Sequence, residues 1–135
     1  MKYHFLPKIF FLTICYILLA ICHMPYAICQ ERPSSSELIT KAWDAQGKRQ
    51  FDEVNQYTQQ CIDLYKEQAS RQHAVLKGYS SKDQFPLSDV AVAYFIQAEA
   101  LMRQEKLPEA VEKFQYVIDH YRYAVAWDPS RGVYW

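Results

Sequence analysis

The strongest constraint on this chain is a pair of adjacent amphipathic segments near its C-terminus. They run from Asp89 to Arg103 and from Leu107 to Tyr123, with a short turn between them. Apolar residues recur in each at intervals of three and four, which aligns them along one side of an α-helix. The first stripe contains Ala91, Tyr94, Phe95, Ala98, Leu101 and Met102, and the second contains Leu107, Ala110, Val111, Phe114, Val117, Ile118 and Tyr121. Two such helices bury their stripes by packing together, so the sequence predicts an all-α fold built on a helical hairpin.

The segment 34–77 carries a weaker copy of the same pattern. Ser34 and Glu37 form a capping box, which predicts that a helix begins at the residue after Ser34. A second helix opens at Phe51 and extends to Leu76, because no helix-breaking residue interrupts that stretch. The apolar stripes are Leu38, Ile39, Ala42 and Ala45 in the first helix, and Phe51, Val54, Tyr57, Cys61, Ile62 and Tyr65 in the second. The sequence therefore predicts two hairpins of one kind.

Small and bulky residues are combined at the contacts between the two later helices. Ala98 and Ala110 are small enough for the helices to approach closely, while Tyr94 and Phe114 fill the space beside them. This combination resembles the tetratricopeptide repeat, a helical hairpin of about 34 residues that stacks into arrays and binds other proteins. The first hairpin resembles it less closely, because Val54 replaces the small residue. The resemblance implies two degenerate repeats that form a short α-solenoid.

The chain departs from the family's pattern in two places. Arg49 and Glu105 stand at the turns, where the family usually has glycine. Phe51 and Leu107, which occupy equivalent positions in the two hairpins, are 56 residues apart rather than about 34. The additional residues extend the second helix and form a polar loop over 78–88. This loop is either a surface connection, which we favour, or a lip over the groove between the hairpins.

The family resemblance also implies a protein-interaction role on the concave face, which the first helix of each hairpin lines. The exposed candidates for partner binding on that face are Lys41, Asp44, Lys48, Gln97 and Arg103. Aromatic residues crowd the last stretch of the chain, and they suit protein recognition because they present rigid apolar area. Trp127 and Trp135 are the candidates there, both for a partner and for self-association.

The N-terminal segment 1–29 has the composition of a secretory signal peptide. A basic start is followed by an apolar run over 9–21, and the first acidic residue is Glu31. This run of about 13 residues is shorter than the roughly 20 that cross a bilayer. We therefore expect cleavage after Cys29, or alternatively after Cys22, and export to the periplasm, the cell envelope or the outside. An uncleaved anchor is disfavoured, and so is a lipid on either cysteine, because isoleucine precedes both where lipoprotein signals have glycine or alanine.

Residue types used in catalysis or metal binding form no recognisable set. The chain has no glycine-rich phosphate loop, no paired-cysteine zinc spacing and no nucleophile elbow. His73 and His120 lack an acid or nucleophile at helical spacing, and Cys61 has apolar neighbours that favour burial. Acidic and basic residues number 15 each and are mixed along the chain, so nucleic acid has no basic patch to bind. We expect no enzymatic activity, no cofactor and no metal.

The C-terminal stretch 124–135 is predicted to be the aromatic start of a further helix, because Asp128 is a suitable N-cap and Pro129 suits the first helical position. A helical array normally ends in a helix with one polar face, which this stretch does not offer. The end is then either truncated or covered by a partner. Two alternatives stay open: the N-terminal accessory region of a longer exported enzyme such as a carbohydrate-active hydrolase, and a structural subunit of an envelope complex. The predicted segments are 1–29 (signal peptide), 30–33 (exposed leader), 34–77 (first hairpin), 78–88 (loop), 89–123 (second hairpin) and 124–135 (start of the further helix).

Overall fold

The computed structural model describes residues 31–78, 85–128 and 133–134 of the chain. The predicted signal peptide and Trp135 lie outside these residues, as does Pro129. The chain divides into two units, Met1–Arg32 and Pro33–Trp135, and every element described below belongs to the second. Among the described residues, no helix combines the length and the apolar character that a membrane span requires.

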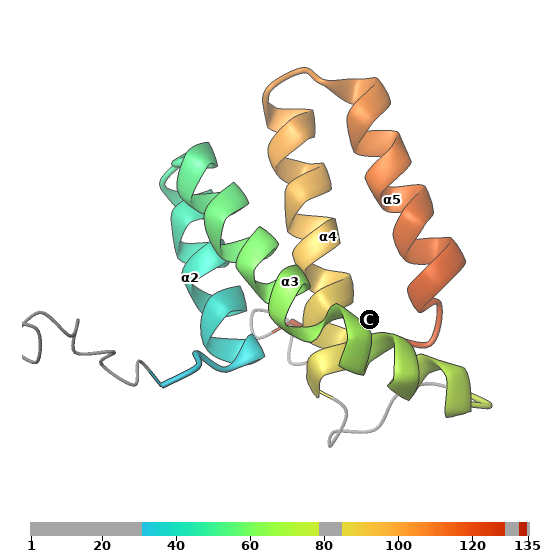
Figure 1. Cartoon of the computed structure of the whole chain (residues 1–135). Helices are drawn as coiled ribbons and strands as arrows, with labels where there is room; N and C mark the ends of the chain where they lie inside the picture. Colours follow the sequence, from blue (N-terminus) through green and yellow to red (C-terminus); the bar gives the residue numbers. More distant parts are fainter. Residues whose placement is uncertain (1–30, 79–84, 129–132, 135) are drawn as a thin grey trace, which may run out of the picture. The chain divides into compact units, whose positions relative to one another are not determined.

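Four α-helices make up nearly all of the described second unit (Figure 1). They are α2 (Ser35–Gly47), α3 (Phe51–Val75), α4 (Phe85–Arg103) and α5 (Leu107–Tyr121). A minimal antiparallel strand pair, β1 (Trp127–Asp128) and β2 (Val133–Tyr134), follows them, with Trp127 opposite Tyr134. The prediction of an all-α fold is confirmed for the four helices.

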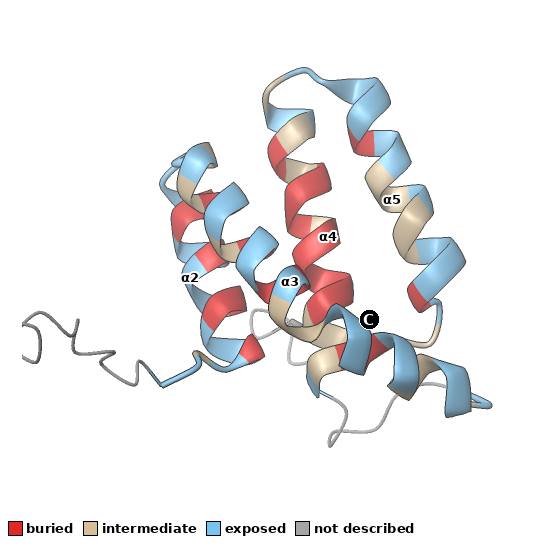
Figure 2. Cartoon of the chain, viewed as in Figure 1, coloured by how far each residue is buried: buried red, intermediate tan, exposed pale blue. Residues whose placement is uncertain are grey.

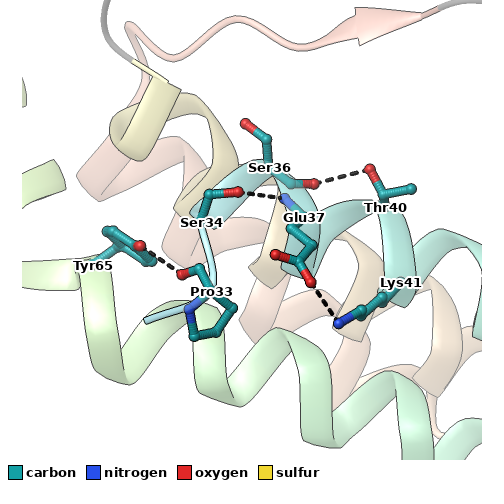
Figure 3. A network of polar contacts seen from close by, with 7 residues as sticks. All are labelled: Pro33, Ser34, Ser36, Glu37, Thr40, Lys41 and Tyr65. Carbon is teal, nitrogen blue, oxygen red and sulfur yellow. Dashed lines mark hydrogen bonds and ion pairs between the residues drawn. The ribbon is translucent and has the colours of Figure 1, made fainter. Parts of the chain in front are cut away.

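Residue Ser34 starts α2 as an N-cap, and the first turn around it is tied to α3 (Figure 3). The Ser34 hydroxyl accepts the backbone N–H of Glu37 at 3.2 Å, which is one half of the predicted capping box. The Glu37 carboxylate instead accepts a hydrogen bond from Lys41 Nζ at 2.6 Å. The Tyr65 hydroxyl of α3 donates to the Pro33 carbonyl oxygen at 2.7 Å. These bonds fix where the helical unit begins.

Both hairpins turn in the same way at the end of their first helix. Arg49 and Glu105 adopt left-handed backbone conformations, with φ of 58° and 62°. The residue after each donates its N–H back five residues: Gln50 to the Ala45 carbonyl and Lys106 to the Leu101 carbonyl, both at 3.0 Å. This is the Schellman pattern of helix termination, in which glycine is the usual left-handed residue. The turns are therefore equivalent although neither contains the glycine that makes this conformation inexpensive.

The core is centred on α4, which packs against the other three helices (Figure 2). Buried residues surround the middle of this helix, so its sequence is apolar on more than one side. Its partners contribute smaller stripes, and α3 also packs against α2. Ala98 and Ala110, which the sequence places at a close helix contact, are both buried. Among the largest fully buried side chains are Leu38, Val54, Leu87, Val90 and Ile96.

The N-terminal end of α4 differs from the sequence prediction, since the helix begins at Phe85 and not at Asp89. Two contacts explain the difference. The Gln72 side-chain oxygen, from α3, accepts the backbone N–H of Leu87 at 3.0 Å and so satisfies a donor of the first turn. Asp89 is not a cap, because its carboxylate accepts the hydroxyl hydrogens of Ser35 at 2.6 Å and Ser36 at 2.9 Å. Contacts with α3 and α2 have replaced the local cap.

The C-terminal segment also differs from the prediction. Helix α5 ends at Tyr121, and the following chain reaches the first turns of α4, where the Val125 N–H donates to the Ser88 hydroxyl at 3.4 Å. The prediction of a further helix is wrong for the described residues of this stretch, because Trp127–Asp128 and Val133–Tyr134 are paired strands. Three of the four strand residues, Trp127, Val133 and Tyr134, are aromatic or β-branched and favour extended backbone, which outweighs the capping signal of Asp128.

Candidate protein-interaction surface

Gln97, a predicted partner-binding residue, lies in the interior and not on an exposed face. Its side chain is 4% exposed. Its amide nitrogen donates to the Thr58 hydroxyl at 3.0 Å, and its amide oxygen accepts from Lys113 Nζ at 2.9 Å. The Thr58 hydroxyl in turn donates to the Val54 carbonyl at 2.7 Å. The prediction for Gln97 is therefore wrong. The residue joins α3, α4 and α5 through a series of side-chain hydrogen bonds, and these bonds make the burial of a glutamine acceptable.

The binding residues predicted on α2 are exposed, but they do not lie on the side of α2 that faces α4. Lys41 pairs with Glu37, and its pKa is raised by the hydrogen bond and by the charge of that carboxylate, with a smaller contribution from Tyr57 of α3. Lys48 is the C-cap residue, and Asp44 is exposed. Trp43, which contacts α4, lies about 160° around the helix from Lys41, since successive residues turn by about 100°. The charged candidates thus occupy other sides of α2 than the one beside α4.

Three aromatic side chains, one from each of α2, α4 and α5, form what we call the aromatic row. The ring centroids of Trp43 and Phe95 are 6.5 Å apart, and those of Phe95 and Phe114 are 5.4 Å apart in an edge-on arrangement. Trp43 is 38% exposed, and the two phenylalanines are half-buried. The sequence placed Phe95 and Phe114 in the apolar stripes of their helices, whereas Trp43 lies outside the stripe predicted for its helix. The sequence signal for this row was a bulky aromatic residue close to a small buried alanine in each helix: Trp43 follows Ala42, Phe95 precedes Ala98, and Phe114 follows Ala110.

A cleft of about 160 Å³ lies beside Phe95, between α4, α5 and the segment that follows α5. A volume near 150 Å³ accommodates a benzene-sized group, so the cleft can take one large apolar side chain. Arg122 is the one charged side chain among the described residues around it. The lining residues are Ser88, Ala91, Val92, Phe95, Val117, Tyr121, Arg122, Ala124, Val125 and Ala126.

Arg103, the remaining charged candidate, is exposed in the last turn of α4, where a cation complements the helix dipole. The backbone of Trp127 lies in β1, and Trp135 lies outside the described residues. The five candidates whose side chains the structure describes, Lys41, Asp44, Lys48, Gln97 and Arg103, belong neither to the aromatic row nor to the cleft lining. The helices that the prediction assigned to binding, α2 and α4, do contribute Trp43 and Phe95.

A second aromatic cluster joins α3, α4 and α5 and contains tyrosine and cationic groups. The rings of Tyr94 and Tyr116 are 4.6 Å apart, and Lys66 Nζ lies 5.4 Å from the centre of the Tyr116 ring. Burial and a hydrogen bond to Tyr116 raise the pKa of Tyr94 to about 12. Burial acts to raise the pKa of Tyr116 as well, but the hydrogen bonds from Lys66 and Tyr94 outweigh it and lower the pKa. These contacts stabilise the packing between the hairpins.

Two histidines and one cysteine lie within the described residues, and all three make packing contacts. His120 stacks on Tyr116 with centroids 4.0 Å apart, and His73 lies 5.4 Å from the Tyr123 ring. Cys61 is fully buried, and burial raises the pKa of its thiol to about 12, with a smaller effect from the Asp89 charge. A thiol with this pKa is a poor nucleophile at neutral pH. In the part of the chain that the structure describes, no group of three or more His, Cys, Asp or Glu side chains is placed to hold a metal ion.

Comparison with known proteins adds no relative to these observations. No family model matches the chain, and no curated protein or solved structure matches it either. The surface itself is therefore the basis on which we infer a function.

Proposed function

We propose that this chain is an exported, non-enzymatic protein-interaction module of the tetratricopeptide-repeat type. The observation that carries the proposal is the aromatic row beside the apolar cleft, since three helices each place a large aromatic side chain at one partly exposed site. Aromatic anchors and pockets of side-chain size are the usual centres of binding energy in protein interfaces. The ligand is a segment of a partner protein that inserts one large apolar side chain into the cleft.

The equivalence of the two hairpins supports the repeat interpretation. Each first helix ends in the same Schellman turn, at Arg49 and at Glu105. Helix α2 packs against both α3 and α4, and α4 packs against α5, which is the neighbour order of stacked helical hairpins. In such stacks the first helices lie side by side and line one face. Trp43 and Phe95 come from these two helices.

The sequence supports the proposal of export. The segment 1–29 begins with basic residues and continues with an apolar run, which is the order of a secretory signal. The helical unit begins at Pro33, shortly after the proposed cleavage site. Intact-mass measurement of the protein recovered from the periplasm, the cell envelope or the medium tests the proposal of export. We expect a chain that begins at Gln30. A full-length chain or an acylated cysteine would contradict it.

Selection from a displayed random-peptide library tests the binding proposal directly, with the immobilised protein as bait. We expect enrichment of peptides that contain a large apolar residue. Affinities are then measured for Trp43→Ala, which removes part of the row, and for Ala124→Leu, which fills the cleft. Each change should weaken binding tenfold or more, because a hot-spot contact contributes about 2 kcal/mol or more.

The matched control is Val75→Ala, which truncates an apolar side chain that is exposed at the end of α3, away from the row. We expect its affinity to equal that of the unaltered protein. A library that yields no enriched peptide, or peptides that bind all four proteins equally, would contradict the proposed site.

A further inference from the structure

Helix α5 exposes apolar side chains that no described part of the chain covers. Leu107, Val111 and Ile118 are 57%, 64% and 59% exposed, whereas Ala110 and Tyr121 on the neighbouring side of the helix are buried against the core. The sequence places all five in one stripe, but the structure divides them. The apolar sector of α5 is wider than α4 can cover. We call the exposed residues, together with the half-buried Phe114, the α5 stripe; Phe114 also stands at the end of the aromatic row, so the two surfaces meet at this residue.

The spacing of the α5 stripe is self-complementary. Its four residues, 107, 111, 114 and 118, are separated by intervals of four, three and four, which read the same from either end. An antiparallel copy of the helix therefore sets Leu107 opposite Ile118 of the other copy, and Val111 opposite Phe114. No charged residue lies within the stripe, and a/d-like spacing of this kind is what packed helix pairs use.

From this pattern we infer that a second copy of the chain covers the α5 stripe, with the two α5 helices antiparallel about a two-fold axis between Glu112 and Lys113. Closed two-fold contacts use the same patch on both subunits, as the symmetric spacing allows. Residues Ala124–Ala126, which follow α5, do not cover the stripe, since they pack beside the first turns of α4. Without the proposed signal peptide the chain has 13 basic and 15 acidic residues, a formal charge of −2, so the net repulsion between two copies is weak.

The exposed area is sufficient for a weak dimer. Each of the three exposed side chains offers roughly 100 Å² of apolar surface. Two copies together would remove roughly 600 Å² of this surface and, with the polar rim of α5, approach the lower end of the range for specific interfaces, about 1,200 Å². We therefore expect a concentration-dependent dimer with a dissociation constant on the order of micromolar.

Sedimentation velocity of the full chain over a concentration series measures this dimer. The test variant is Val111→Glu, which places a charge at the centre of the stripe on a side chain that is exposed in the monomer and so leaves the fold intact. We expect its dissociation constant to rise at least tenfold. The matched control is Gln56→Glu, which adds the same charge to an exposed position of α3 and should leave the dimer unchanged.

Disulfide cross-linking tests the register in a chain whose native cysteines have been replaced. In the antiparallel arrangement the two copies of residue 111 lie about 5 Å apart along the helix axis, and the two copies of residue 118 about 16 Å apart, at a rise of 1.5 Å per residue. Val111→Cys should cross-link to itself, and Ile118→Cys should not. A mixture of Leu107→Cys and Ile118→Cys chains should form the mixed disulfide.

A monomer at every concentration, or a dimer that Val111→Glu does not weaken, would overturn the inference. Cross-linking of Ile118→Cys to itself would overturn the antiparallel register. Trp43→Ala serves to separate this inference from the proposed partner site, because it should weaken peptide binding and leave sedimentation unchanged.

Discussion

The buried glutamine of α4 gives the most detailed prediction of stability. Gln97 makes two side-chain hydrogen bonds, to Thr58 at 3.0 Å and from Lys113 at 2.9 Å, and the second involves a charged donor. Gln97→Met keeps the side-chain volume and removes both bonds. Thr58 keeps a partner, because its hydroxyl still donates to the Val54 carbonyl. Lys113 is only partly buried and can be hydrated. The expected loss is therefore about 1 to 2 kcal/mol in the free energy of unfolding, not the larger penalty of a stranded polar group.

Gln97→Ala adds a cavity to the same loss of hydrogen bonds. The side chain is 4% exposed and lies between α3, α4 and α5, so the space cannot fill with solvent without opening the core. We expect a total loss of about 2 to 4 kcal/mol. Urea unfolding followed by circular dichroism at 222 nm measures both variants. A double-mutant cycle of Gln97→Met with Lys113→Met should show a coupling of about 1 kcal/mol.

Two results would refute this reasoning. If Gln97→Met is as stable as the unaltered protein, or more stable, the hydrogen bonds of Gln97 do not stabilise the fold. If the cycle shows no coupling, Lys113 does not bond to Gln97 in solution.

The remaining predictions concern the turns, a close helix contact and a titrating group. Glu105→Gly and Arg49→Gly each place glycine at a left-handed backbone position, so each should raise the free energy of unfolding by about 1 kcal/mol. Urea titrations measure the change. A loss of stability in both variants would contradict the shared turn geometry. Ala110→Leu should lower the free energy of unfolding by about 1 to 3 kcal/mol, because Ala110 is 1% exposed; a neutral effect would mean that the helices do not meet there. Burial raises the pKa of Asp89 above its ordinary value of 3.8, although hydrogen bonds from Ser35 and Ser36 oppose the shift. The folded state then binds this proton more tightly than the unfolded state, so the free energy of unfolding should fall as the pH rises from 3.8 through the raised pKa. Asp89→Asn should remove this part of the pH dependence, and an unchanged slope in its urea titrations at several pH values would contradict the assignment.

Local signals in the sequence predicted the helices well. Some signals depend only on neighbours within a few positions: the Ser34 cap, the apolar periodicity and the small residues Ala98 and Ala110. The structure contains the Ser34 cap, and it buries both alanines. The long α3 helix also follows from the absence of a breaker before Gly78, and it ends at Val75. Such features need no knowledge of the tertiary contacts.

The errors arose where a distant residue decides the outcome. Glutamine usually occupies exposed positions, but Thr58, 39 residues before Gln97, supplies a buried hydrogen-bond partner for its amide. The start of α4 moved to Phe85 because Gln72 of another helix caps it. Polar residues can be placed by sequence reasoning only when their partners are known. The same limit applied to the candidate site, because Trp43 and Phe95 become neighbours only when α2 and α4 pack together.

The most direct test of the central claim is a map of amide and side-chain chemical-shift changes when an enriched peptide is added to the isotopically labelled protein. We expect the largest changes on the Trp43 indole, the Phe95 ring and the Ala124–Ala126 segment, with little change at the tyrosine cluster of Tyr94 and Tyr116. Changes centred on that cluster, or spread evenly over all four helices, would contradict the assignment of the aromatic row and its cleft as the binding site.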